Sequence, residues 1–268
     1  MRLIASHLSR LVRRPASWIT LGMLAAMIAL VFIALAATAE QTASQPGGEA
    51  ILQLLTFPMA YAFVLTFAIQ IGSLFAVIYF AAVAGSEWNW GTFKNAVARG
   101  ESRGRYVLSA YVALGLLAGV GLLIVFLIGV GAAAVGAGIA GVGTDGLGDP
   151  DALLGLPNQL WRAWLALAEA GAIGFVFATL ARSPLAGVGA GIALYFIEEF
   201  AGLLLPDVVR WLPFQAASAV IAGADTSGIS GGAGNPLEPG LALVVVLAWM
   251  IGSLAVAVAF AERAEITG

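Results

Sequence analysis

FPMAYAFVLTFAIQIGSLFAVIYFAAVA, residues 57–84, runs directly into GSEWNWGTFKNAVARGESRGRY, residues 85–106. The first stretch has no charged residue and is longer than the about 20 residues that an apolar helix needs to cross a bilayer. The second holds four of the twelve basic residues, including the only lysine, Lys94. A new apolar run begins at Tyr106. The pattern predicts two membrane helices joined by a polar hairpin that lies outside the membrane.

The composition places the whole chain in the membrane. Of 268 residues, 61% are hydrophobic and 10% are charged, so lipid must cover most of the apolar surface. Cysteine is absent, which excludes disulfides, thiolate metal sites and cysteine nucleophiles. The single histidine, His7, is near the start, which excludes a histidine-based metal site or a Ser-His-Asp triad within the membrane.

Six apolar segments are near or above the length needed to span a bilayer. We predict transmembrane helices at residues 18–39, 57–84, 106–134, 160–180, 185–205 and 241–260. The chain, residues 1–268, then forms a single all-α integral membrane domain, with a hairpin at 85–105 and an outer loop at 206–239. The stretch WLPFQAASAVIAG within that loop is apolar enough to re-enter the membrane between the fifth and sixth helices.

The basic residues indicate the orientation of the chain, because cytoplasmic loops carry an excess of lysine and arginine. With the N-terminus in the cytoplasm, ten basic residues lie inside and only Arg162 and Arg210 lie outside. Both termini and the hairpin are therefore predicted to be cytoplasmic. In residues 1–16, Ile4, Leu8 and Leu11 share one helical face, which favours a helix lying in the membrane interface over a frayed basic tail.

The sequence argues against an enzyme. A P-loop ends in Gly-Lys-Ser/Thr, whereas Lys94 stands between Phe93 and Asn95. The pair Glu198-Glu199 is similar to the paired glutamates of membrane-embedded prenyl-protein proteases, but no histidine follows His7 to complete such a site. We expect no cofactor in this chain and no nucleic-acid partner.

Three carboxylates fall within the predicted membrane helices: Glu169, Glu198 and Glu199. A charge at the bilayer centre costs about 2.5–3.5 kcal/mol on the insertion scale, so such groups usually face a bundle interior or a water-filled cavity. They are candidates for lining a substrate pathway. A hydrogen bond that packs two helices is the alternative.

The hairpin itself has the pattern of a short amphipathic helix. Thr92 is a candidate N-cap, and Phe93, Ala96 and Val97 follow at helical spacing. Basic residues surround this apolar stripe, including Arg99 and Arg103. An ordinary basic loop that fixes the topology is the alternative.

The order of residues in the hairpin resembles the cytoplasmic signature of ABC-2 type transporter permeases. Glu87 is followed by Trp90-Gly91-Thr92, then by Ser102-Arg103 and Arg105-Tyr106. Gly100-Glu101 stands where that family often has a proline before Ser-Arg. The basic N-terminal helix, six spans, cytoplasmic termini and apolar outer excursion also fit, so the resemblance covers essentially the whole chain.

The resemblance implies a permease subunit, an exporter in a bacterial inner or plasma membrane. Such permeases pair as homodimers or related heterodimers, pass substrate along the dimer interface, and each bind a cytoplasmic ATPase subunit that holds ATP and Mg²⁺. A coupling helix at about residues 92–100 would seat in that ATPase, with the N-terminal helix bracing it and Glu87 as an anchor. The contact residues would be Phe93, Lys94, Val97, Arg99 and Arg103.

Two other classes of function stay open. One is a stand-alone secondary transporter or channel that uses Glu169 and Glu198 as ion-coupled groups. The other is a non-transporting membrane scaffold that holds a soluble partner through the same hairpin.

Overall fold

The computed structural model describes residues 2–45, 48–221 and 236–264. These residues form helices, turns and loops, with no β-strand among them. Six of their helices are long and apolar enough to cross a membrane, which confirms a multi-pass, all-helical membrane protein. They are α2 (Pro15–Ala37), α5 (Met59–Asn89), α7 (Arg103–Ile139), α8 (Pro150–Ala181), α9 (Pro184–Gly202) and α12 (Pro239–Arg263).

The helices begin and end at different residues from the predicted spans. Pro15, Pro150, Pro184 and Pro239 each stand at the first turn of a long helix, where a missing N–H is harmless and a fixed φ suits the helix. The largest difference is in α8, whose span was predicted from residue 160 because the preceding turns are less apolar. Helices α5 and α7 both extend into the polar hairpin.

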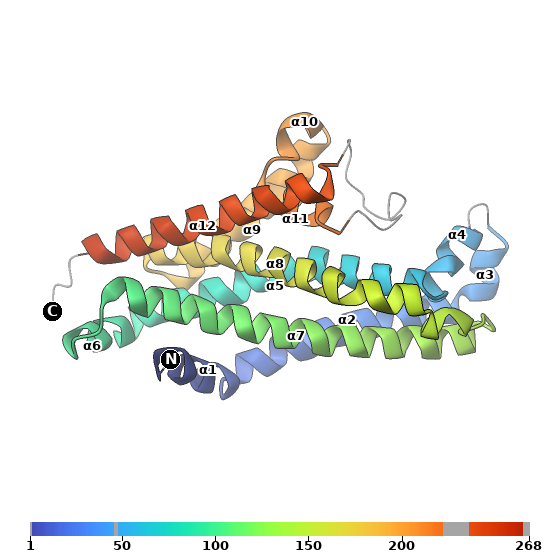
Figure 1. Ribbon diagram of the computed structural model, residues 1–268, viewed down its shortest axis with the longest axis horizontal. Helices are drawn as coiled ribbons and strands as arrows, with labels where there is room; N and C mark the ends of the chain where they lie inside the picture. The colour runs from blue at the N-terminus through green and yellow to red at the C-terminus, as the bar shows by residue number, and fades with distance from the viewer. Residues whose placement is uncertain (1, 46–47, 222–235, 265–268) are drawn as a thin grey trace.

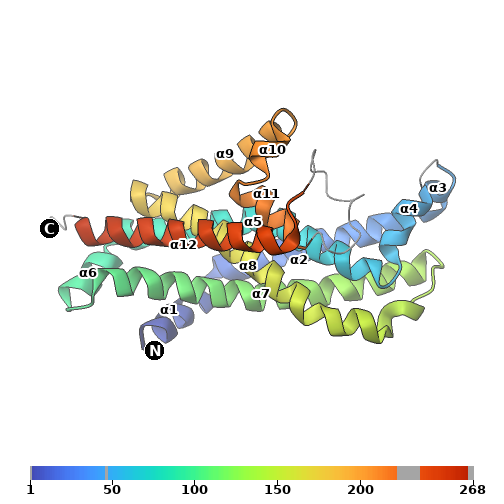
Figure 2. The same ribbon diagram turned by 45° about the horizontal axis from the view of Figure 1, so that its top comes forward.

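Helix α8 is the centre of the bundle, as Figures 1 and 2 show. In its most apolar window 83% of the residues are buried, against 17% in α2 and α9 and 22% in α12. Small residues let neighbours approach it closely: a Cβ at Gly174 would lie 2.3 Å from the carbonyl oxygen of Val77 on α5. The outer helices therefore expose most of their apolar surface to lipid, while α8 packs against protein.

Short helices lie at both ends of the bundle (Figure 1). Helix α1 (Arg2–Val12), helix α6 (Thr92–Ala98) and the end of α12 lie at one end, which we call the hairpin end. The opposite end carries α3 (Ala39–Ala43), α4 (Gly48–Leu52) and the 3-10 turns Gln53–Leu55 and Asp145–Gly148.

The predicted outer loop at 206–239 is partly helical. It contains α10 (Pro206–Val209) and α11 (Pro213–Ala219), and α11 packs on α12, α8, α5 and α9. Phe214, Ala216 and Ala217 are buried, so the apolar stretch folds against the bundle. Residues 222–235 of the loop lie outside the described part of the chain.

Candidate functional site

Two glycines shape the hairpin around α6. Gly91 before the helix and Gly100 after it have φ angles of 68° and 90°, the left-handed region that glycine enters without steric cost. Gly91 occupies the N-cap position, so the prediction that Thr92 caps α6 was wrong. The Thr92 hydroxyl instead donates to Glu87 Oε2 at 2.7 Å and to the Glu87 carbonyl at 3.0 Å. Thr92 thus ties the start of α6 to the end of α5.

Glu87 is the centre of a buried polar cluster at this end. Its side chain is 8% exposed, with Arg10 Nη1 3.5 Å and Arg14 Nη2 3.9 Å from Oε1. On the other oxygen, Oε2 accepts hydrogen bonds from Tyr106 and from Thr92. The carboxylate therefore joins the N-terminal segment to α5, α6 and α7, and we call these five residues the Glu87 cluster.

His7 extends this cluster on α1. Its Nδ1 accepts from Arg10 Nη2 at 2.8 Å, and its ring stands edge-on to Tyr106 with centroids 4.8 Å apart. Burial, and after it the positive charge of Arg10, lower the pKa of His7 to about 4. The imidazole is therefore neutral at pH 7, with Nδ1 free of a proton to accept from Arg10.

The apolar side of α6 faces the protein. Phe93 is 1% exposed and packs between the rings of Trp88 and Tyr106, with centroids 4.4 and 5.7 Å away. Phe93 was expected to contact a partner ATPase, but its burial leaves it no surface for such a contact. Val97 is half-buried against the apolar side chains that surround Phe93. The phenyl ring instead fixes α6 on the ends of α5 and α7.

The basic side of α6 faces solvent. Lys94, Asn95 and Arg99 are exposed, and Arg99 Nε donates to the Asn95 carbonyl at 3.1 Å. We call these three residues the α6 outer face. Of the predicted contact residues, Lys94 and Arg99 are therefore presented outward, and Arg103 has a different role.

Arg103 fastens the end of α12 to the hairpin. Its Nη1 donates to the carbonyls of Glu262 and Ala264, both at 2.8 Å. Arg182, in the α8–α9 turn, lies over the rings of Trp88 and Phe260, 5.3 Å from each centroid. All parts of the chain that reach the hairpin end are thus connected there.

Sequence reasoning gave Arg10, Arg14 and Arg182 only a role in topology. Nothing local marks them as partners of Glu87 and Trp88, because the contacts join residues that are far apart in the chain. Tyr106 belonged to the recognised pattern, but its bond to Glu87 was not foreseen.

The three membrane carboxylates occupy different environments. Glu169 and Glu198 are both 0% exposed, whereas Glu199 is exposed. Glu198 Oε2 accepts from the backbone N–H groups of Phe214 and Gln215 at 2.9 and 3.2 Å, at the start of α11. That is the helix-packing role rather than the pathway role. Neither carboxylate oxygen of Glu169 has a hydrogen-bond partner among the described residues.

Among residues 2–45, 48–221 and 236–264, no group of three or more His, Asp or Glu side chains lies close enough together to hold a metal ion. Comparison of the sequence with protein-family models and with curated proteins found no match.

Proposed function

We propose that this chain is the permease subunit of an ATP-binding cassette exporter, driven by a separate cytoplasmic ATPase that binds ATP and Mg²⁺. The observation that supports the proposal is that α6 presents its basic outer face beyond the membrane helices and is itself fixed to them. A loop that only determines topology needs positive charge, but it does not need to be held in place by these contacts.

Two sets of contacts connect α6 to the bundle. The Glu87 cluster joins it to α1 and α7, and the Phe93 ring packs it on Trp88 and Tyr106. Beside it, Arg103 holds the end of α12. A displacement of α6 by the ATPase is therefore passed to α1, α5, α7 and the end of α12. ATP binding changes the permease only if the ATPase binds its two conformations with different affinity.

The burial of the carboxylates limits which of them can line a substrate pathway. If substrate passes between two permease chains, its path is lined by side chains on the outer surface of each chain. Glu169 and Glu198 lie inside the bundle, so only Glu199 of the three has the exposure for that role. In this proposal Glu198 positions α11, which lies beside the outer end of the pathway.

Co-purification with charge-reversal variants tests the ATPase contact. The chain is purified from native membranes in mild detergent, and the bound subunit is quantified by its mass and by ATP hydrolysis. We expect one ATPase per chain for the wild type. The double variant Lys94→Glu/Arg99→Glu should retain about one tenth as much ATPase, or less. Like charges placed across an interface cost several kcal/mol.

The control is Arg2→Glu/Arg263→Glu, which makes the same charge change at exposed positions of the hairpin end. It should retain the ATPase. Equal loss in both double variants, or no ATPase with the wild type, would refute the docking proposal. A bound partner that does not hydrolyse ATP would favour a membrane scaffold.

One observation favours a second candidate, an ion-coupled secondary transporter. Glu169 is a fully buried carboxyl group on the central helix, and neither of its oxygens is hydrogen-bonded within the described residues. Buried ionisable groups of this kind are typical of proton and ion relays. Proton-driven transport in vesicles without any ATPase, abolished by Glu169→Gln, would establish this function in place of the first.

A further inference from the structure

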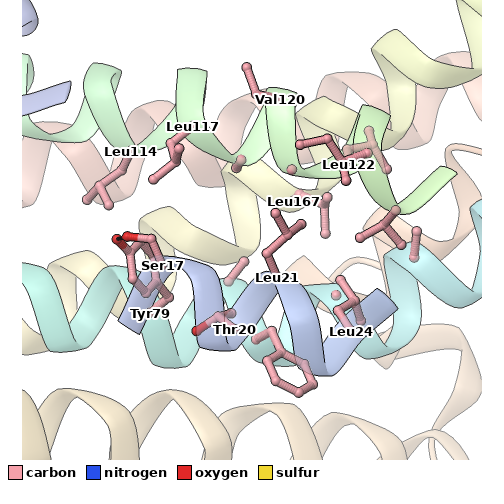
Figure 3. Close-up of a pocket in the computed structure, with 18 of the residues that line it drawn as sticks. Ser17, Thr20, Leu21, Leu24, Tyr79, Leu114, Leu117, Val120, Leu122 and Leu167 are labelled. Carbon is pink, nitrogen blue, oxygen red and sulfur yellow. Dashed lines mark hydrogen bonds between the residues drawn. The ribbon is translucent and has the colours of Figure 1, made fainter. Parts of the chain in front are cut away.

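An apolar cavity lies between α2, α5 and α7, apart from the Glu87 cluster and the three carboxylates. Its volume is about 310 Å³. Much of its wall is formed by Leu21 and Leu24 of α2, Leu117 of α7 and Leu167 of α8 (Figure 3). Phe75 of α5 also lines it. A space of this size is at the lower end of the range of small-molecule sites.

The polar groups of the cavity lie at one end. Ser17, Thr20 and Tyr79 supply hydroxyl groups there, while Leu24 and Leu122 lie toward the other end (Figure 3). Ser17 Oγ donates to the Leu11 carbonyl at 2.6 Å, so Tyr79 donates to Ser17 in the bond between them. The wall of the cavity is thus almost wholly apolar, with its few hydroxyl groups next to the junction of α1 and α2.

The hydroxyl end is open and close to positive charge. Two lining residues at this end, Val12 and Trp18, are 42% and 58% exposed, so the cavity reaches the surface of the protein here. Arg13 and Arg14 directly follow Val12, and Arg13 is exposed. Within a bilayer, this opening faces the boundary between acyl chains and headgroups.

We propose that the cavity holds one acyl chain of an anionic phospholipid, with the phosphate at Arg13. An empty cavity forfeits dispersion contacts along its wall, and water has too few polar partners there to replace them. A lipid chain fills the space, and basic residues beside the membrane attract an anionic headgroup. The bound chain braces α2 against α5 and α7, whether or not the protein is an exporter.

Blocking the cavity tests the site. A Cβ at Gly121, a lining residue, has Leu21 Cδ1 at 3.7 Å as its contact, so Gly121→Phe directs a ring into the space. Gly131→Phe is the control, because Gly131 is exposed on the same helix and a Cβ there meets nothing within 4 Å. Lipid that stays with the detergent-purified protein is measured by native mass spectrometry after exchange with phosphatidylglycerol or phosphatidylcholine.

We expect the wild type and Gly131→Phe to retain one phosphatidylglycerol per chain. Gly121→Phe should bind it at least about tenfold more weakly, because its ring takes space that the acyl chain would fill. Arg13→Gln should reduce the preference for phosphatidylglycerol over phosphatidylcholine by about fivefold, the effect of one charge at the membrane surface. Equal retention by both phenylalanine variants would overturn the cavity site, and equal retention of both lipids by the wild type would overturn the headgroup assignment.

A milder pair of substitutions covers the case in which Gly121→Phe does not fold. The natural chain has no cysteine, so Thr20→Cys inside the cavity and Gly22→Cys on the exposed side of α2 can each be labelled alone. A membrane-soluble maleimide is added to protein in detergent with increasing phosphatidylglycerol. Protection of Thr20→Cys but not of Gly22→Cys supports the site, and equal labelling rates at every lipid concentration contradict it.

Discussion

Glu87 shows how one side chain can hold several segments together. It is buried at the point where α1, α5, α6 and α7 meet, and its two oxygens bind partners from each neighbour. A buried carboxylate of this kind is costly to bring out of water, and its partners are costly to leave unpaired. The contribution of Glu87 is therefore best measured by graded substitutions.

We expect Glu87→Ala to lower the free energy of unfolding by about 2–3 kcal/mol, because Thr92 and Tyr106 lose their acceptor and the partly exposed Arg10 and Arg14 lose their counter-charge. Glu87→Gln should cost less, about 1 kcal/mol, since an amide still accepts from Thr92 and Tyr106. Thermal unfolding in detergent measures both. Glu40→Gln, an exposed glutamate at the opposite end, is the control. If all three variants unfold alike, the cluster has no structural role.

The single histidine should give the protein a pH-dependent stability. Burial and the charge of Arg10 lower the pKa of His7 to about 4 from 6.5, with Arg14 acting in the same direction and Glu87 opposing it. Between these values the unfolded chain binds a proton that the folded chain does not. Stability should thus be constant above about pH 6.5 and fall as the pH drops toward about 4.

Chemical denaturation across pH 7.5 to 5 measures this dependence, and His7→Gln supplies the comparison. We expect stability to fall more steeply toward pH 5 in the wild type than in His7→Gln, because all other titrating groups are common to the two proteins. A slope that persists unchanged in His7→Gln would contradict the assignment to His7.

The residues of the Glu87 cluster that could be predicted are those close to one another in the sequence. Glu87, Thr92 and Tyr106 belong to one local pattern, so the sequence singled them out together. Arg10 and Arg14 reach Glu87 only through tertiary folding, and periodicity carries no information on such a pairing. For the same reason Phe93 could be placed on an apolar stripe but not on the buried side.

At the scale of elements, the packing of α5 on α8 depends on the absence of side chains. Gly171 and Gly174 allow Phe80 and Val77 to approach the α8 backbone directly. In a membrane the hydrophobic effect does not drive helices together, so close van der Waals packing of this kind stabilises their association instead. The centre of the bundle is therefore intolerant of added volume.

Gly174→Ala should destabilise the protein by about 1–3 kcal/mol, the typical effect of overpacking. The added Cβ would lie 2.3 Å from a backbone oxygen, which cannot turn away as a side chain can. Gly189→Ala, on α9 with nothing within 4 Å, should be neutral or slightly stabilising, since alanine restricts the unfolded chain. Thermal unfolding compares the two, and a neutral Gly174→Ala would disprove the tight crossing.

Hydropathy located all six long helices, but their ends depend on other signals. Four of the six long helices begin with proline in their first turn. This is a local signal, and an average of hydropathy over a window does not detect it. The centrality of α8 could not be predicted, because every span is apolar enough for lipid and composition does not separate lipid contact from protein contact. The burial of α11 was hidden for the same reason.

At the scale of the whole molecule, the two ends differ in charge. Arginines and the lysine are concentrated at the hairpin end, and acidic residues such as Glu40, Asp145 and Asp149 lie at the other. This asymmetry is the basis for the predicted orientation with the hairpin in the cytoplasm.

Labelling in intact cells tests that orientation. Ser44→Cys and Asn95→Cys place single cysteines at exposed positions of opposite ends. A membrane-impermeant maleimide should label Ser44→Cys in intact cells, and Asn95→Cys only after permeabilisation. The reverse pattern would show that the hairpin faces outward.

The contact of Arg103 with the carbonyls of Glu262 and Ala264 has a practical consequence for protein engineering. Because the end of α12 is held at the start of α7, a soluble domain fused after residue 264 through a short flexible linker would start at the hairpin end, where α6 also lies. Tethering at this range produces effective concentrations in the millimolar range. Under the proposed function, a fusion of this chain with its ATPase would then stay assembled under dilution that separates two independent chains.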